Sequence, residues 1–260
     1  YKLIGYKKKI IFTFPELPYN IKKLIHERCL EKNAGPFAII PDFQKFSASQ
    51  KKIVMKEAQY EDLTEAKLRG LYNDDIVFQY YIKSLDKPLP GKGSGEKIPN
   101  DRLREYATLA SIPQWRKKLS NFWQQPFTLD NHKWATIEHY YQASKYKKSH
   151  PEFYLSFSLD SGTDLSKDPV MAKAAGSKSG KLKGELLKPI EVIMDSDFTG
   201  NREKKELYAA QYAKFTQNDD LKALLLSTGD AKLVHFMKGK EPEISDELML
   251  VRDKIRKNEL

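Results

Sequence analysis

The sequence predicts an α+β fold, mainly helical, with a few short strands and a small N-terminal α+β appendage. Hydrophobic residues make up 40% of the 260 residues and aromatic residues 12%, so the chain can bury a proper core. Apolar residues recur at helical spacing in several segments, whereas runs rich in β-branched and aromatic residues are few and short. We expect residues 1–70 to form the appendage and residues 71–260 to form the main domain.

The first 70 residues mix strand and helix patterns. A basic strand is expected within residues 1–14, with its β-rich core at 10–14, followed by an amphipathic helix over 19–32. A short strand over 37–40 and one or two helices over 47–71 complete this part. The segment carries no catalytic motif, and we interpret it as a separate appendage of unknown role.

The main domain is expected to open with a strand over 75–82, followed by a loop over 87–96. Three glycines alternate in this loop, Gly91, Gly93 and Gly95, and such spacing lets backbone N–H groups approach an anion. The Gly-Lys-Ser/Thr ending of a Walker motif is absent. Two interpretations stay open, a phosphate or base contact and a plain mobile loop.

Helices are predicted for much of the remaining chain, over 101–109, 168–175, 202–215, 221–227 and 245–255. The second of these has strong end signals, because Asp168 is a preferred N-cap, Pro169 suits the first turn and Gly176 ends the pattern. Asp219 or Asp220 is expected to cap the fourth.

The stretch from Leu119 to Tyr146 carries the strongest functional signal. It is typical of an aromatic-rich strand pair that runs into a short helix. On that helix Glu138, Tyr141, Gln142 and Lys145 are spaced by three, four and seven residues, so they share one face. Two turns separate the first from the last, about 10.5 Å of axial rise, which is wide enough to straddle a sugar ring.

This stretch closely resembles the signature of the NADAR domain, the YbiA-like family. The matching residues are Leu-Ser-Asn-Phe at 119–122, Pro-Phe at 126–127, Trp134, and Glu-His-Tyr-Tyr-Gln-Ala-Ser-Lys-Tyr at 138–146. The resemblance covers roughly residues 75–260 and weakens after 235. It implies N-glycosidase chemistry on ribose-linked substrates, either phosphoribosylamino pyrimidines of the riboflavin pathway or ADP-ribose attached to guanine.

The chemistry implied by the resemblance needs particular groups. Breaking an N-glycosidic bond develops positive charge at the anomeric carbon and requires a proton for the leaving base. Glu138 suits the stabilisation of that charge or the holding of ribose hydroxyls. Lys145 suits the nucleophile, which would give a ring-opened Schiff base that water resolves.

A nucleophilic lysine must be a neutral amine, so its surroundings must lower its pKa. The aromatic residues expected to bury this amine are Tyr141, Tyr146, Trp123 and Trp134. An ordinary pair of surface residues on an amphipathic helix is the alternative reading of Glu138 and Lys145 without the family resemblance.

The candidate substrate-binding residues are polar, aromatic or basic positions around this helix, namely Tyr81, Ser120, Asn121, Phe122, Trp123, Trp134, Tyr141, Gln142, Lys178 and Phe198. Asn121 is an amide in an apolar strand and needs partners, either substrate or backbone in a turn. The two tryptophans and Phe127 either stack on a base or pack in the core. His139 is expected to be structural and His132 to lie exposed in a turn.

Two regions leave the choice of substrate open. Residues 177–184 are small and basic, and they form either a phosphate-side loop that includes Lys178 or a solvated connector. The chain also departs from the family near its C-terminus. Phe198 stands where many members have a tryptophan, and His235 follows residues 231–234 where many have a glutamate and then a glycine-rich stretch.

Charge and composition limit the classes of partner that the protein is expected to have. The net charge is +10, and residues 1–100 hold 18 Lys and Arg against 12 acidic residues. Such a surplus can attract nucleic acid or phosphorylated ligands, although a lysine-rich solvated surface is the plainer reading. A single cysteine, Cys29, excludes an internal disulfide, and an intracellular location fits best. We expect no membrane span, signal peptide, metal or cofactor.

These observations favour an N-glycosidase that removes ADP-ribose from guanine, because the basic balance suits a nucleotide or nucleic-acid substrate. Phosphoribosylamino pyrimidines are the alternative substrates. A catalytically inactive nucleotide-binding or structural module with the same fold is the rival class of function.

Overall fold

A computed structural model of the protein describes residues 3–6, 9–13, 70–85 and 89–257. The chain divides into two compact units, residues 1–57 and residues 58–260. In the first unit, strands β1 (Leu3–Tyr6) and β2 (Lys9–Thr13) form an antiparallel hairpin. The single strand expected within residues 1–14 is therefore two strands. The elements expected between residues 15 and 69 lie outside the described residues.

A three-stranded sheet forms one side of the second unit. Strand β3 (Asn73–Tyr80) runs parallel to β8 (Ala231–His235), which pairs antiparallel with β9 (Glu243–Ile244). The inward residues of β3 alternate, and Ile76, Phe78 and Tyr80 are buried, as expected for a strand with one face on the core. The strand predicted over 75–82 is confirmed, shifted by two residues.

The aromatic strand pair is a tight hairpin. Strands β4 (Phe127–Leu129) and β5 (His132–Trp134) are joined by Asp130 and Asn131, whose φ angles are 54° and 63°. Two successive left-handed residues match the right-handed twist of a two-residue hairpin. His132 is thus the first residue of a strand, not part of a turn, and its Nδ1 lies 3.2 Å from an Asp160 carboxylate oxygen.

Helix α6 (Ile137–Ser144) follows the hairpin directly. Thr136 is its N-cap, and the Thr136 hydroxyl accepts a hydrogen bond from the His139 backbone N–H at 3.2 Å. On the far side of the helix, the Tyr140 hydroxyl lies 2.8 Å from Asp130 and 2.5 Å from Glu206. These contacts hold α6 between the hairpin turn and helix α9.

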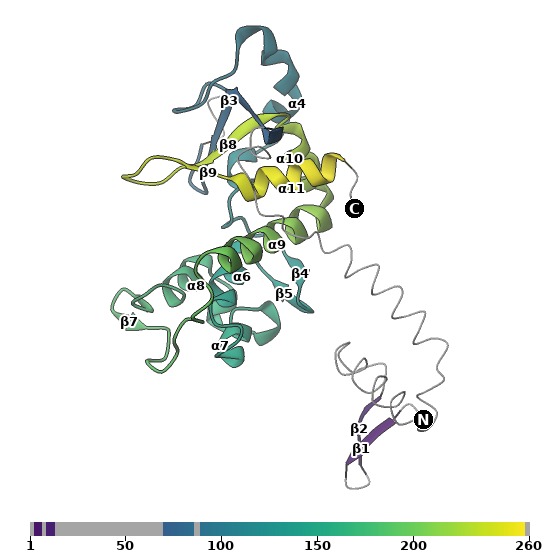
Figure 1. The fold of residues 1–260 in the computed structure, drawn as a ribbon, viewed down its shortest axis with the longest axis vertical. Coiled ribbons are helices and arrows are strands. Elements are labelled where there is room, and N and C mark those ends of the chain that lie inside the picture. Colours follow the sequence, from purple (N-terminus) through teal and green to yellow (C-terminus); the bar gives the residue numbers. More distant parts are fainter. Residues whose placement is uncertain (1–2, 7–8, 14–69, 86–88, 258–260) are drawn as a thin grey trace. The chain divides into compact units, whose positions relative to one another are not determined.

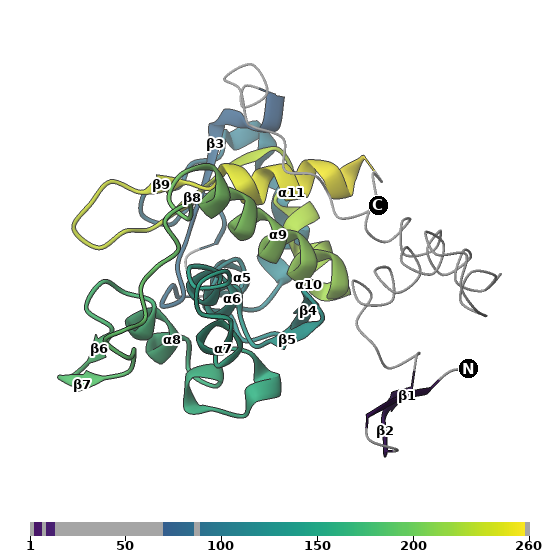
Figure 2. The ribbon, with the colours of Figure 1, turned by 60° about the horizontal axis from the view of Figure 1, so that its bottom comes forward.

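Helix α9 (Asn201–Gln217) is the central element of this unit, as Figures 1 and 2 show. It packs against α6 and β4 on one side and against α10 (Asp219–Ser227) and α11 (Asp246–Arg256) on the other. The mainly helical α+β fold predicted from the sequence is confirmed. Among the described residues, no helix is both long and apolar enough to cross a membrane.

The smaller elements complete the unit. They are η3 (Asn100–Tyr106), α4 (Ala107–Ser111), α5 (Trp115–Lys118), α7 (Pro151–Leu155), η4 (Leu159–Ser161), η5 (Asp164–Ser166), α8 (Pro169–Ala175), β6 (Lys181–Leu182) and β7 (Glu185–Leu186). Asp168 caps α8 as predicted, and its carboxylate accepts from the Val170 N–H at 2.8 Å. The N-cap of α10 is Asn218, whereas Asp219 and Asp220 lie in its first turn.

Candidate active site

One face of α6 brings together the four predicted polar residues. The Glu138 Oε1 atom accepts a hydrogen bond from Gln142 Nε2 at 2.9 Å. The Gln142 Oε1 atom accepts in turn from Lys145 Nζ at 2.6 Å. Carboxylate, amide and amine therefore form one continuous hydrogen-bonded chain along two turns of the helix. The Lys145 amine also lies 5.2 Å from the centre of the Tyr141 ring.

The C-terminal end of α8 contacts the Lys145 end of this hydrogen-bonded chain. The Gly176 carbonyl accepts a second hydrogen bond from Lys145 Nζ, at 3.0 Å. A Cβ atom at Gly176 would clash with the Gln142 side chain, so only glycine lets the two helices approach this closely. A neutral amine has two N–H groups, and both have acceptors here, which leaves the Lys145 lone pair available.

Burial shifts the pKa values of the two residues at the ends of this hydrogen-bonded chain. It raises the pKa of Glu138, against the hydrogen bond from Gln142 and the positive charges of Lys173 and Lys145. It lowers the pKa of Lys145, against the negative charges of Glu138 and Glu203. The carboxyl group is therefore more readily protonated, and the amine more readily neutral, than either would be in water.

Glu203 is a site residue that sequence reasoning missed. It lies in the first turn of α9, and its carboxylate accepts a short hydrogen bond from the Tyr141 hydroxyl. Burial, this hydrogen bond and nearby negative charge raise the pKa of Tyr141, so the phenol stays protonated. Phe198 is buried, and its ring packs edge-on against that of Tyr141, with 5.9 Å between the ring centres.

The Leu-Ser-Asn-Phe segment is tied to the start of α6. The Asn121 carbonyl accepts from the Glu138 N–H at 3.0 Å, and Ser120 Oγ accepts from the Phe122 N–H at 3.3 Å. The turn-forming bond considered for Asn121 is thus made by Ser120. The side-chain oxygen of Asn121 is buried and has no hydrogen-bond partner within the described parts of the chain. A buried acceptor without a partner is uncommon in folded proteins.

Lys173 on α8 is a second residue that the sequence did not single out. Its amine lies 5.3 Å from the centre of the Phe122 ring, and its charge acts on both Glu138 and His235. Burial lowers the pKa of His235, at the end of β8. The Tyr81 ring lies beside it, with a centre-to-centre distance of 6.0 Å. The sequence places these groups far apart, and only the fold relates them to Glu138.

The two tryptophans of the signature do not surround Lys145 as expected. Trp134 is fully buried, and its ring packs edge-on against Tyr140, 5.1 Å between centres. It takes the core-packing role that was its alternative. Trp123 is partly buried, and its indole N–H donates to Gln125 at 3.1 Å. Burial of Lys145 instead comes from its own helix and from the end of α8.

The glycine-rich loop holds an anion that belongs to the protein itself. The Glu96 carboxylate accepts from the backbone N–H groups of Gly91 and Gly93 at 3.1 and 3.0 Å. Arg116 forms an ion pair with the same carboxylate at 2.7 Å, and both side chains are buried. A phosphate contact at these glycines is therefore not supported, because Glu96 fills the position. The loop is a structural nest for Glu96.

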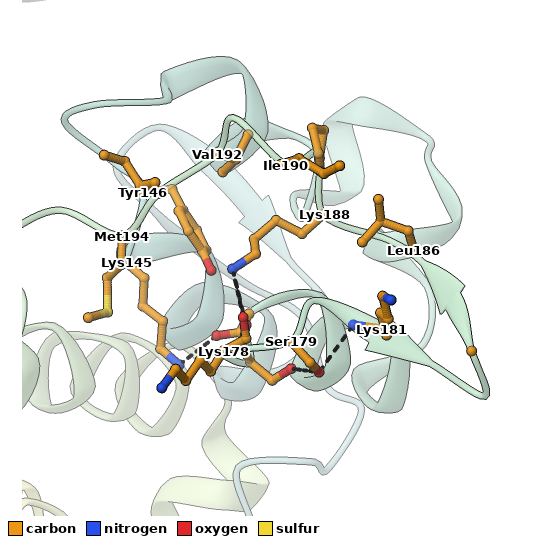
Figure 3. A pocket seen from close by; sticks show the side chains of 15 residues that line it. Lys145, Tyr146, Lys178, Ser179, Lys181, Leu186, Lys188, Ile190, Val192 and Met194 are labelled. Atoms are coloured by element: carbon orange, nitrogen blue, oxygen red, sulfur yellow. Dashed lines mark hydrogen bonds between the residues drawn. The ribbon is translucent and has the colours of Figure 1, made fainter.

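Lys178 shares a pocket with Lys145, and Glu138 is not among the residues that line it. This pocket of about 870 Å³ extends from the C-terminal end of α6 to the β6–β7 hairpin. Figure 3 shows the Lys145 side chain reaching toward the segment of Lys178 and Ser179. No group of three or more His, Cys, Asp or Glu side chains with metal-binding geometry occurs in the described ranges.

The geometry agrees with a comparison against protein-family models, in which the NADAR domain matches residues 112–239. This part of the chain is a NADAR domain. The family is associated with N-glycosidase activity. The matched range contains every candidate site residue except Tyr81.

Comparisons with individual proteins add little to the family match. The NMR structure of the E. coli protein YbiA aligns with 20% sequence identity and a TM-score of 0.39, covering 72% of this chain and 86% of YbiA. Comparison with curated proteins gave no significant match.

Proposed function

We propose that the NADAR domain hydrolyses the N-glycosidic bond between a ribose and a base, and that its substrate is ADP-ribose attached to guanine. The observation that carries the proposal is the buried chain from Glu138 through Gln142 to Lys145. A carboxyl group and an amine, both shifted toward their neutral forms, stand at its two ends. General acid and nucleophile are the two roles that cleavage of this bond needs.

In the proposed reaction, the Lys145 amine donates its lone pair to the anomeric carbon. The bond from that carbon to the base nitrogen breaks, and the base leaves with the electron pair and takes a proton from Glu138. A proton moves from the attached nitrogen to the ring oxygen, the carbon–oxygen bond of the ribose ring breaks, and a protonated Schiff base forms. Water then adds to the Schiff base and releases ADP-ribose and the Lys145 amine, and the proton set free returns to Glu138. The sum is ADP-ribosyl guanine plus water giving guanine plus ADP-ribose.

The surrounding residues support this sequence of steps. Gln142 holds Glu138 and Lys145 at a fixed spacing, and its amide cannot take up or release a proton at neutral pH. The free Asn121 oxygen can accept from a ribose hydroxyl. Glu203 and Tyr141 form a second acid pair at the same face.

Turnover of defined substrates tests the proposal. The full chain is incubated with an oligonucleotide that carries ADP-ribose on guanine and, separately, with a phosphoribosylamino pyrimidine. Chromatography follows the release of ADP-ribose from the first substrate and of the pyrimidine from the second. We expect release from the first substrate, a loss of at least ~10²-fold for Glu138→Gln, and no loss for Glu152→Gln. Glu152 is an exposed carboxylate on α7 and serves as the matched control.

Each other outcome has a definite meaning. Release from the pyrimidine alone would retain the N-glycosidase and replace its substrate. Release from neither, with ligand binding intact, would favour an inactive nucleotide-binding module. Equal losses in the two glutamate variants would remove Glu138 from the chemistry.

A further inference from the structure

The pocket beside Lys145 has two chemically different sides. Its volume is about 870 Å³, within the usual range for sites that bind small organic ligands. In Figure 3, Lys178 and Ser179 lie on one side, and Ile190 and Val192 lie on the opposite side. The pocket belongs to the α8 end, the β6–β7 hairpin and the segment that follows, and only Lys145 and Tyr146 come from the end of α6.

One side of the pocket is basic. Lys178, Lys181 and Lys188 line it together with Lys145, and no acidic residue is among the lining residues. Within the described ranges, none of these lysines forms an ion pair with a carboxylate of the protein. The Lys188 amine is instead held by the Ser177 carbonyl at 3.2 Å, which aims its charge into the pocket. Clustered, unneutralised ammonium groups with adjacent hydroxyls are suited to phosphate oxygens.

The opposite side is apolar and open to solvent. Ile190 is 86% exposed, Ile193 67%, Leu186 46% and Met194 45%. A group of large apolar side chains in contact with water marks a surface that a ligand or partner covers. A flat heteroaromatic base covers such a surface well, because it buries apolar area while its edges stay hydrated.

We propose that this pocket binds the nucleoside-diphosphate arm of the substrate, with its phosphates against Lys178, Lys181 and Lys188 and its base against the apolar side. This inference rests on the proposed function, which places the ribose that loses its guanine at Lys145. It also separates the two substrate classes. A phosphoribosyl pyrimidine has no second base and would leave the apolar side uncovered, whereas an ADP-ribosyl group has both the phosphates and the adenine.

Calorimetric titration of the full chain with ADP and with inorganic pyrophosphate tests this assignment. We expect both to bind, and Lys181→Glu to weaken both by about tenfold or more. Lys183→Glu is the matched control, because Lys183 lies in the same hairpin, is exposed and does not line the pocket. It should change either affinity by less than about twofold. Equal effects of the two variants would show non-specific attraction and overturn the site.

The apolar side is tested by Ile190→Ser. This variant should weaken ADP binding and leave pyrophosphate binding unchanged, and ADP binding that does not respond would overturn the base-binding half. Glu138→Gln separates this inference from the proposed function. The variant should lose turnover and still bind ADP. ADP binding by a wild-type protein that turns over no ribosyl substrate would support the pocket and refute the proposed reaction. Turnover by a wild-type chain that does not bind ADP would overturn the pocket alone.

Discussion

Two influences act on the pKa of Lys145 in opposite directions. Burial lowers its pKa, whereas the negative charge of Glu138 raises it. Gln142 bridges the two residues by hydrogen bonds, and their charges also act directly on each other. This coupling makes the pH dependence of the reaction a direct report on the site.

The pH profile of Glu138→Gln is predicted to differ from that of the wild type in a defined direction. Activity should rise with pH as Lys145 loses its proton, below the ordinary lysine pKa. Where Glu138 is ionised, its charge raises the Lys145 pKa, and the uncharged amide of the variant removes that effect. The rising limb of kcat/KM against pH in the variant should therefore move to lower pH. A limb that stays in place or moves upward would show that Lys145 is not the group that titrates.

Gly176 is predicted to be required for activity more than for folding. Its φ is −76°, so an added Cβ causes no backbone strain, but it would strike the Gln142 side chain. Gly176→Ala should reduce kcat by about tenfold or more, as expected when a catalytic amine is displaced, and should lower thermal stability by a few degrees. Adding Gln142→Ala should restore the stability and not the activity. Recovery of both in the double variant would contradict a role for Gln142 in holding Lys145.

At the scale of elements, α9 carries a buried lysine that the site uses indirectly. Lys214 is fully buried, and its amine donates a short hydrogen bond to the Trp123 carbonyl, next to the Leu-Ser-Asn-Phe segment. Burial lowers its pKa to about 7, with only the charge of Asp220 in opposition. The helix thus anchors the segment that contacts the start of α6, at a cost in stability when Lys214 is protonated.

Lys214→Met is predicted to stabilise the folded protein and to lower its turnover rate. The unfolded chain keeps its lysine protonated up to about pH 10.4, while the folded pKa is about 7. Between these values the unfolded state binds more protons, so the free energy of unfolding rises with pH across this window. The variant should lose that rise and gain about 1–4 kcal/mol near pH 7 and below. Urea unfolding at pH 6 and pH 9 measures both effects.

Loss of the Trp123 anchor should also lower turnover in the same Lys214→Met protein, because the Asn121 carbonyl then holds α6 less firmly. A variant with unchanged stability at both pH values would show that the amine is not desolvated. A more stable variant with full activity would show that the anchor is dispensable.

How far the elements could be predicted depends on how local their signals are. The β4–β5 hairpin, α6 and α8 were predicted because their turn residues, caps and spacing are contiguous in the sequence. The contact of Tyr141 with Glu203 joins residues 62 apart, and no local pattern indicates it. The glycine-rich loop left its two interpretations open for another reason. A nest of N–H groups has the same sequence pattern whether its anion is a ligand or Glu96.

In the whole molecule, the matched domain and its sheet both begin well after the first of the two units. The NADAR match begins at residue 112, and the sheet strand β3 begins at Asn73. The buried Arg252 donates to the Leu71 carbonyl at 3.0 Å, which ties the segment just before β3 to helix α11. We expect the residues before the predicted boundary near residue 70 to add nucleic-acid binding, and the residues after it to carry the glycosidase activity.

A truncated protein that begins at Leu71 is predicted to fold and to retain glycosidase activity on a small nucleotide substrate. The full chain should bind nucleic acid more tightly than the truncated protein, because residues 1–100 carry most of the basic surplus. That difference should shrink steeply as salt rises. Gel filtration, turnover and binding at two salt concentrations measure these outcomes. An insoluble truncated protein would place the first 70 residues within the folding unit and refute the boundary.

Reductive trapping shows whether the Lys145 amine attacks the ribose. Sodium borohydride is added during turnover of the full chain on ADP-ribosylated guanine, and the protein is analysed by intact mass and peptide mapping. We predict a covalent ribosyl adduct on Lys145 that is absent without substrate and absent in Lys145→Ala, which should also be inactive. A wild-type enzyme that turns over without any adduct, together with an active Lys145→Ala, would contradict the covalent mechanism.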